Sequence, residues 1–268
     1  TAVLPSTFLM LGIPAKIAGC KEIVVCSPPQ SDGKVNCYIA YVATLLNIEK
    51  VYLAGGAQAV AAMAYGTETV PQVYKIFGPG NRFVTEAKKQ VQNSVSIDMP
   101  AGPSEVLVLA DETAIPSYAA ADLLAQAEHG SDSQSILTIT SIKTAEEVIK
   151  EVEKQLAELP RKDIAAAGIE NSYVIVVENL QQGMEFSNYY APEHLILATE
   201  NFQPLIPLIT NAGSVFLGNL TPESAGDYAS GTNHTLPTSA FAKAYSGVSI
   251  DTFIKKITFQ HLNENGLK

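Results

Sequence analysis

Two pairs of side chains in the sequence could act as acids, bases or metal ligands. Gln126 and His129 are three residues apart in residues 123–130, where an apolar stripe and a final glycine indicate the end of a helix. They would share one helix face, and two donors on adjacent turns could begin a metal site. Glu193 and His194 directly precede an apolar strand. A neutral imidazole could remove a proton there, and the glutamate could activate a water.

Both pairs also have an ordinary structural interpretation. Gln126 and His129 could simply be the polar end of a helix, which is the more common case for such pairs. Glu193 and His194 could form an exposed, polar entrance to a strand, in which adjacent side chains point to opposite faces. The residue types alone therefore leave a catalytic and a structural interpretation open for each pair.

A third candidate is the polar, glycine-rich segment of residues 222–238, which contains Asp227 and His234. We expect it to be irregular, and a long irregular segment inside a compact domain is either a functional loop or disordered. Its carboxylate and imidazole could complete a Zn²⁺ shell together with Gln126 and His129. Glutamine is an unusual zinc ligand, so the spacing alone does not lead to zinc.

Two glycine turns lie between a predicted strand and a predicted helix, at residues 55–58 and 78–81. Such turns can present backbone N–H groups to a phosphate, and two adjacent turns make a better crevice than one. The second turn is not a G-x-G-x-x-G fingerprint, because Phe83 stands at the third glycine position. The P-loop, H-E-x-x-H and G-x-S-x-G motifs are absent from the sequence.

Alternating strand-like and helix-like segments would position these residues. Strands are predicted at residues 21–26, 50–54, 74–77, 105–110, 135–140, 173–177, 195–198 and 214–217, and helices at 2–18, 35–46, 57–65, 82–92, 117–129 and 145–159. The order indicates parallel sheets covered by helices, and therefore an α/β fold. The turn-rich residues 98–104 divide it into two incomplete Rossmann-like lobes, residues 1–103 and 104–249, followed by a C-terminal connector at 250–268.

Composition excludes several classes of protein. The 268 residues are 47% hydrophobic and 16% charged, which excludes intrinsic disorder. A net charge of −10 argues against nucleic acid or an anionic membrane surface as the main partner. No apolar run approaches the ~18 residues of a membrane span. Cys20, Cys26 and Cys37 form no C-x-x-C pair, so we expect free, mostly buried thiols in a reducing compartment.

Six motifs together resemble the histidinol dehydrogenase family, and the resemblance extends over essentially the whole chain. The motifs are GGAQAVAA, KIFGPGNRFVTEAK, DMPAGPSEVLVLAD, ADLLAQAEHGSDSQ, NYYAPEHL and ESAGDYASGTNHTLPT. The resemblance implies oxidation of L-histidinol to L-histidine in two hydride transfers to NAD, through an aldehyde, with Zn²⁺ needed for substrate binding. It also implies an intertwined homodimer whose active sites lie at the interface, in the cytoplasm or, in a plant, an organelle such as a plastid.

The resemblance also implies roles for individual residues. His194 is then the general base and Glu193 activates the water of the second step. The other implied contacts are Gln126, His129 and Asp227 with zinc and substrate, Ser104 and His234 with substrate, and Gln58 and Asn81 with NAD. The first lobe would accordingly be the NAD side, and the second lobe the zinc and substrate side.

The sequence departs from the family pattern at both ends. Family members have a further N-terminal segment and a C-terminal tail that supplies a glutamate and a zinc-binding histidine to the partner's site. Here the sequence stops at Lys268, and His261 is not in the matching context, so we expect a truncated chain. Two alternatives stay open: a non-catalytic fragment that keeps the fold, and a zinc-dependent hydrolase in which Glu193 activates water.

Overall fold

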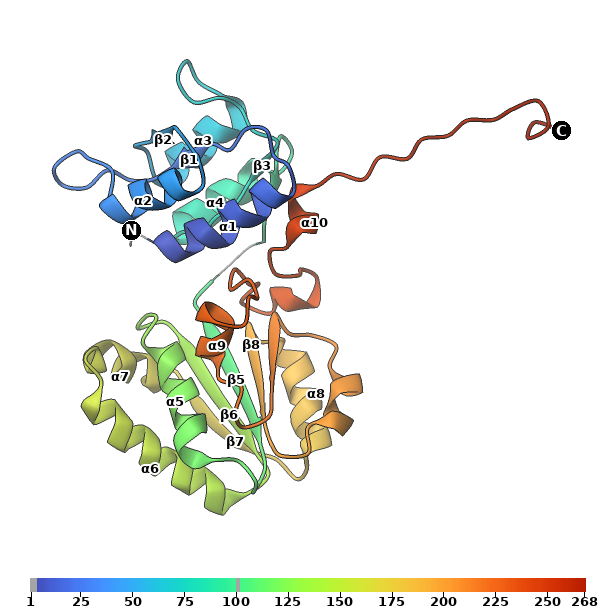
Figure 1. The fold of residues 1–268 in the computed structure, drawn as a ribbon. Coiled ribbons are helices and arrows are strands. Elements are labelled where there is room, and N and C mark those ends of the chain that lie inside the picture. Colours follow the sequence, from blue (N-terminus) through green and yellow to red (C-terminus); the bar gives the residue numbers. More distant parts are fainter. Residues whose placement is uncertain (1–3, 100–101) are drawn as a thin grey trace.

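A five-stranded parallel sheet forms the larger part of the fold. The computed structural model describes residues 4–99 and 102–268 (Figure 1). The strand order is β7-β6-β5-β8-β9. The strands are β5 (Glu105–Ala110), β6 (Gln134–Ile139), β7 (Tyr173–Val176), β8 (His194–Ala198) and β9 (Ser214–Leu217). In chain order this is 3-2-1-4-5, the order of a doubly wound sheet with β5 at its centre.

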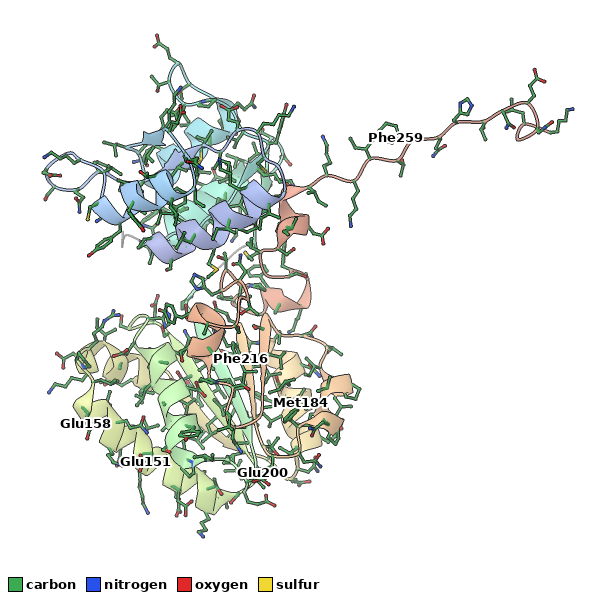
Figure 2. The ribbon with its side chains drawn as sticks, in the orientation of Figure 1. Glu151, Glu158, Met184, Glu200, Phe216 and Phe259 are labelled. Carbon is green, nitrogen blue, oxygen red and sulfur yellow. The ribbon has the colours of Figure 1, made fainter. Side chains whose placement is uncertain are left out.

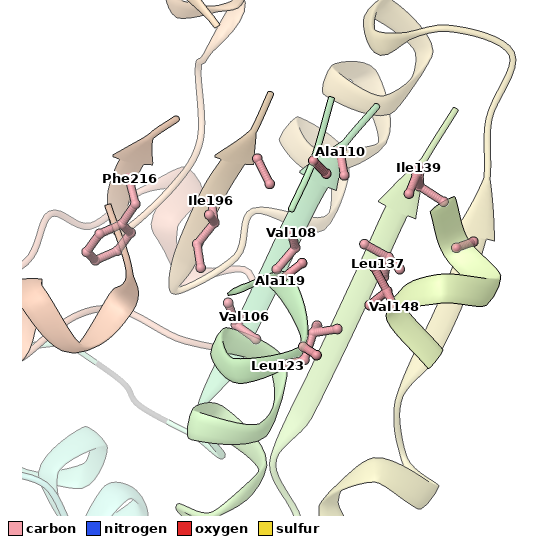
Figure 3. Packing of buried hydrophobic residues seen from close by; sticks show 14 residues of the cluster. Val106, Val108, Ala110, Ala119, Leu123, Leu137, Ile139, Val148, Ile196 and Phe216 are labelled. Atoms are coloured by element: carbon pink, nitrogen blue, oxygen red, sulfur yellow. The ribbon is translucent and has the colours of Figure 1, made fainter. Parts of the chain in front are cut away.

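Helices cover both faces of this sheet, which is why its central strand is apolar at nearly every position. The helices are α5 (Pro116–Ala127), α6 (Ile142–Glu158) and α7 (Lys162–Glu170) on one face, and α8 (Leu180–Tyr190) with the 3₁₀ helix η1 (Gln203–Leu208) on the other (Figure 1). Val106 and Val108 of β5 pack with Leu123 on the α5 side, as Figure 3 shows. Leu107 and Leu109 pack on the α8 side with Met184. Alternate side chains of one strand therefore belong to two cores.

The strand register places the first residues of four strands along one edge of the sheet. Glu105 pairs with Gln134, Val106 pairs with His194, and His194 pairs with Ser214. Because all the strands are parallel, this edge is their amino edge. Polar side chains at strand starts that are far apart in the sequence are thereby brought together.

Residues 4–99 form two small parallel sheets with four helices. Strand β1 (Val25–Cys26) pairs with β2 (Val51–Tyr52), and β3 (Lys75–Ile76) with β4 (Ser96–Ile97). The helices are α1 (Pro5–Ile17), α2 (Cys37–Leu45), α3 (Gly56–Tyr65) and α4 (Arg82–Gln90). A separate apolar cluster lies here, built around Val60, Ile76 and Val95. This part carries the two glycine turns, each directly before a helix.

The C-terminal segment leads from the large sheet back to the first part. It contains α9 (Glu223–Tyr228), the 3₁₀ helix η2 (Phe241–Lys243) and α10 (Ile250–Phe253). The ring of Phe253 stacks on Phe77 at 4.3 Å between centroids, and Lys75 Nζ donates to the carbonyl oxygens of Thr252 and Ile254. Beyond α10 the chain extends away from the body, and Phe259 is almost fully exposed there (Figure 2).

These elements confirm the predicted α/β class with mostly parallel sheets. The strands at 105–110 and 214–217 have the predicted bounds, whereas the strands of the first part are only two residues long. The domain boundaries at 103/104 and 249/250 stay a prediction. In the part of the chain that the structure describes, every helix is too short or too polar to cross a membrane.

Two expectations are wrong. Residues 222–238 are not irregular throughout, because α9 forms at Glu223–Tyr228 after Pro222. The cysteines are not mostly buried: Cys20 and Cys26 are half-buried and Cys37 is exposed. Cys37 begins α2, whose buried face is formed instead by Ile39, Val42 and Ala43. An apolar sequence around a thiol therefore does not show which face the thiol occupies.

The central strand makes a direct test of the fold possible. Leu109 is fully buried in the cluster on the α8 side. We expect Leu109→Ala to lower the free energy of unfolding by about 2–5 kcal/mol, through lost burial and the cavity left behind. Urea denaturation followed by circular dichroism measures the loss. Leu267→Ala, at a leucine 74% exposed near the C-terminus, is the matched control and should change stability by less than about 0.5 kcal/mol.

Candidate active site

The backbone of Glu105, the first residue of β5, holds the predicted catalytic pair. Its N–H donates to Glu193 Oε2 at 3.0 Å, and its carbonyl oxygen lies 3.2 Å from His194 Nδ1. A carbonyl oxygen can only accept, so Nδ1 carries the hydrogen and Nε2 keeps a free lone pair. The register of β5 and β8 therefore fixes the tautomer of His194 that can act as a base.

Glu193 and His194 are buried rather than exposed, which makes the interpretation as a polar strand entrance wrong. They do not point apart either, because Glu193 Oε2 lies 3.8 Å from His194 Nδ1. Strict alternation of side chains does not apply to this pair, since β8 begins at His194 and Glu193 precedes it. Burial of two adjacent ionisable groups is costly unless each is in its neutral form.

Burial shifts the pKa values of the two groups in opposite directions. It raises the pKa of Glu193 to about 8, and the negative charges of Glu105 and Asp227 add to the rise while the backbone hydrogen bond opposes it. It lowers the pKa of His194 to about 4. Desolvation disfavours the charged form of either group, which accounts for both directions. Near neutral pH the imidazole is thus unprotonated and available as a base, and Glu193 becomes a carboxylate as the pH rises toward 8.

Two further buried carboxyl groups lie behind this pair. Glu223 Oε1 is 4.0 Å from His194 Nδ1, and the N–H of Glu223 donates to Asp122 Oδ1 at 3.1 Å. Burial raises the pKa of Glu223 well above its usual range and that of Asp122 to about 6. The bond between Asp122 on α5 and Glu223 fixes the start of α9. Sequence reasoning missed Glu105 and Glu223. The signal it could have used was a glutamate placed where an apolar strand or a short helix begins.

Helix α9 brings Asp227 to the same edge of the sheet. Asp227 Oδ1 lies 3.6 Å from His234 Nδ1, and both side chains are largely shielded from solvent. Asp227 contributes to the raised pKa of Glu193, while His129 and His234 contribute to the lowered pKa of His194. Asp227, His129 and His234 therefore lie close enough to Glu193 and His194 to affect the pKa values of that pair.

Gln126 is the clearest sign of a missing partner. It lies in the last turn of α5 with no exposed surface, and within the described residues neither its Oε1 nor its Nε2 has a hydrogen-bond partner. A buried amide without partners costs about 1–3 kcal/mol, so some group is expected to satisfy it. His129, two residues beyond α5, is exposed and its Nδ1 lies 3.0 Å from the carbonyl oxygen of Ala125. This contact leaves its Nε2 available to a ligand.

The residues present fit a zinc ion held partly by an amide. Within residues 4–99 and 102–268, no three His, Cys, Asp or Glu side chains form a metal-binding cluster. The predicted set of Gln126, His129 and Asp227 contains only two such groups, and its third donor would be the unsatisfied Gln126 oxygen. Oxygen and imidazole donors suit a borderline ion such as Zn²⁺.

A cleft of about 650 Å³ lies between the residues around Ser104 and His129 and the glycine turn of the first part. Its lining includes Asn81 and Arg82 at the start of α4, Ser104 before β5, and His129 and Ser133 after α5. Asn81, Ser104 and His129, predicted to contact NAD, substrate and zinc, therefore face one space. Asn81 Oδ1 also caps α4 by accepting from the N–H groups of Phe83 and Val84. Gln58 is exposed on α3 and is not among the residues that line the cleft.

The opposite, carboxyl edge of the large sheet is closed by hydrogen bonds. Asp111 accepts from the Thr113 hydroxyl and from the Thr199 hydroxyl, the latter at 2.6 Å, and Asn219 donates to the Thr113 carbonyl oxygen. Ligands of doubly wound sheets usually bind at this edge. Here these polar groups are paired with one another, whereas Glu105, at the amino edge, and Gln126 and Glu223 each keep a buried polar atom without a hydrogen-bond partner among the described residues.

A family model, a sequence relative and a solved structure all carry the same family description. A family model described as histidinol dehydrogenase matches residues 1–268. Histidinol dehydrogenase of Bacteroides thetaiotaomicron is 61% identical over the whole chain, which spans 63% of that relative's length. The crystal structure of histidinol dehydrogenase from Elizabethkingia anophelis is 57% identical with a TM-score of 0.96, and the match covers 100% of this chain and 62% of that one.

A more distant structure shares only the fold. A probable aldehyde dehydrogenase from Listeria monocytogenes has a TM-score of 0.56 at 14% identity, over 91% of this chain and 70% of that one. The identity is too low to carry a function across, so the likeness concerns the arrangement of helices and strands alone.

The raised pKa of Glu193 predicts a pH-dependent stability effect. The folded protein keeps the Glu193 proton up to about pH 8, while the unfolded chain releases it near its usual pKa of about 4.3. Stability is therefore lost as the pH rises through this window. Glu193→Gln does not titrate and should gain stability over the parent, by about 1–3 kcal/mol more at pH 8 than at pH 5. Urea denaturation at the two pH values measures this difference.

Glu200→Gln is the matched control, because Glu200 is exposed just beyond the carboxyl end of β8 (Figure 2). His194 also makes stability depend on pH, because its lowered pKa removes stability as the pH falls below about 6.5. This contribution is present in the parent and in the Glu193→Gln variant, so it cancels in the difference between their free energies of unfolding. Equal changes for both glutamine variants at both pH values would contradict the assigned burial of Glu193.

Proposed function

Because the chain belongs to the histidinol dehydrogenase family, we propose that it carries the machinery for NAD-dependent oxidation of L-histidinol to L-histidine. The chain spans 63% of the length of the relative from B. thetaiotaomicron, so the proposal concerns the part of the site that these residues supply. The observation that carries it is the Glu105 backbone, which holds His194 as a neutral base beside the water-activating candidate Glu193.

His194 removes the proton in the alcohol oxidation. As hydride leaves the carbinol carbon, the hydroxyl proton passes to His194 Nε2, which is free because Nδ1 donates to Glu105. NAD, when bound, accepts the hydride. Burial lowers the pKa of His194 to about 4, so near neutral pH the imidazole is unprotonated and can accept this proton. The first oxidation thus leaves a proton on His194 and an aldehyde in the site.

Glu193 acts in the second oxidation. Oxidising an aldehyde to an acid requires the addition of water, and the Glu193 carboxylate takes a proton from that water as its oxygen attacks the carbonyl carbon. The hydride that the resulting hydrate loses would pass to a second NAD, when bound. The N–H of Glu105 holds one carboxylate oxygen and leaves the other for the water. Since burial raises the pKa of Glu193 to about 8, we expect this step to speed up between pH 7 and 9.

Zinc and the remaining contacts hold the substrate. Gln126, His129 and Asp227 would bind Zn²⁺, which supplies a Lewis-acidic anchor for the imidazole and amine of L-histidinol. Ser104 and His234 would contact the substrate, with Gln58 and Asn81 on the NAD side. The low charge content, 16% of residues, agrees with a homodimer in which part of the surface is covered.

The assigned base can be tested by His194→Asn. In an assay with L-histidinol, NAD and Zn²⁺, followed by NADH absorbance, we expect two NADH per L-histidine from the parent and a rate at least about 100-fold lower from the variant. His261→Asn, in the exposed C-terminal segment, is the matched control and should keep the parent rate. A variant with parent activity would show that another group is the base. A parent that hydrolyses substrates without NAD would favour a zinc hydrolase, and an inactive parent a fragment without turnover.

The zinc ligand can be tested by Gln126→Leu, with no need for turnover. Without metal, the variant removes a buried amide that lacks partners, so its free energy of unfolding should equal or exceed the parent's by about 1–3 kcal/mol. With Zn²⁺, the parent should gain stability through binding to the folded state, and the variant should lose most of that gain. Thermal denaturation with and without Zn²⁺ measures both effects. An equal gain in both proteins would exclude Gln126 as a ligand.

A further inference from the structure

An ion pair is buried beneath the glycine turn that faces the cleft. Lys88 is the buried side chain of α4, and its Nζ contacts Asp98 Oδ1 just after β4. Their side chains are 7% and 2% exposed, whereas the neighbouring Lys89 is exposed at the surface. Burying two charges costs more free energy than their attraction usually returns, so such a pair is a poor source of stability. Its value is expected to lie in the geometry that it imposes.

Both members of the pair hold the same residue of the turn. Lys88 Nζ donates to the carbonyl oxygen of Gly78 at 2.9 Å, and the N–H of Gly78 donates to Asp98 Oδ2 at 2.8 Å. Gly78 has φ +128°, a conformation that side-chain-bearing residues rarely adopt. The two backbone polar groups of a single glycine, in a conformation that other residues rarely adopt, are therefore both bonded to the buried pair.

The turn that starts at Gly78 forms one wall of the cleft. Gly80, Asn81 and Arg82 line it, across from Ser104 and His129. Asn81 also caps α4, so the orientation of the turn and the start of the helix are linked. Lys88 lies more than one turn along the same helix and returns to Gly78. A closed loop of contacts thus runs from Gly78 through Asn81 and α4 to Lys88 and back.

We propose that Lys88 and Asp98 are positioning residues for the nicotinamide dinucleotide. They act through the turn at residues 78–81 and touch no ligand themselves. This rests on the proposed function, which places NAD on the Asn81 side of the cleft. Charge-assisted hydrogen bonds at both polar groups of Gly78 keep the turn in one conformation, so the dinucleotide does not have to order it on binding.

The test separates this role from a contribution to stability alone. Lys88→Met/Asp98→Leu removes both bonds to Gly78 and leaves no unpaired buried charge, so the protein should fold. We expect the dissociation constant for NADH to rise about tenfold or more, as the loss of a charge-assisted bond implies, and hydrogen exchange at residues 76–82 to accelerate. With turnover, KM for NAD should rise while KM for L-histidinol stays the same. Lys143→Met, at an exposed lysine of α6, is the matched control.

The measured NADH affinity and hydrogen-exchange rates distinguish the possible results. An unchanged NADH affinity in a folded double variant would overturn the proposal. If that variant does not fold, Lys88→Arg and Asp98→Asn replace it: the first keeps a charged donor and should bind nearly as the parent does, and the second should bind more weakly. Equal affinity for both would likewise overturn the proposal. A parent that binds no NADH counts against the proposed function alone. The exchange rate of the Gly78 amide then decides whether the pair holds the turn.

Discussion

The hydrogen bonds between the first residue of the central strand and the start of β8 are the contacts on which the candidate site depends. The N–H of Glu105 donates to Glu193, and its carbonyl oxygen accepts from His194. The pairing of β5 with β8 that builds the sheet therefore also selects the tautomer of His194 and orients the carboxylate of Glu193. A slip of one residue between β5 and β8 would turn both side chains away from these partners and would exchange the two cores. The buried apolar faces of β5 make such a slip costly, and the fold thereby protects the chemistry.

Several ionisable groups are buried close together at the candidate site, at the amino edge of the large sheet. Glu193, Glu223 and Asp122 have raised pKa values and His194 a lowered one, all chiefly through burial. Every one of these shifts means that the folded state has lost hydration of a charge. The fully buried strands next to them supply the compensating apolar burial. This is the expected relation between a rigid core and a functional edge that is less stable than its surroundings.

The sequence predicts best what depends on local burial. Strand β5 is apolar at almost every position because helices cover both faces, and its bounds were predictable for that reason. Helix α8 was missed because polar and aromatic residues obscure the helical period, although Met184 on it is fully buried. The short helix of Glu223 and Asp227 was hidden among glycines and prolines. It forms where Asp122 on α5 accepts from its first N–H, a contact over 101 residues that no local pattern contains.

The two walls of the cleft differ in a way that follows from helix direction. Arg82 begins α4, and His129 lies just beyond the end of α5, so one wall presents a helix amino terminus and the other a carboxyl terminus. The aligned peptide dipoles place roughly half a positive charge at the first wall and half a negative charge at the second. In an acidic protein, this gives a single cavity two electrostatic halves. One half is suited to the phosphates of a dinucleotide and the other to a metal cation, a separation set by the backbone before any charged side chain contributes.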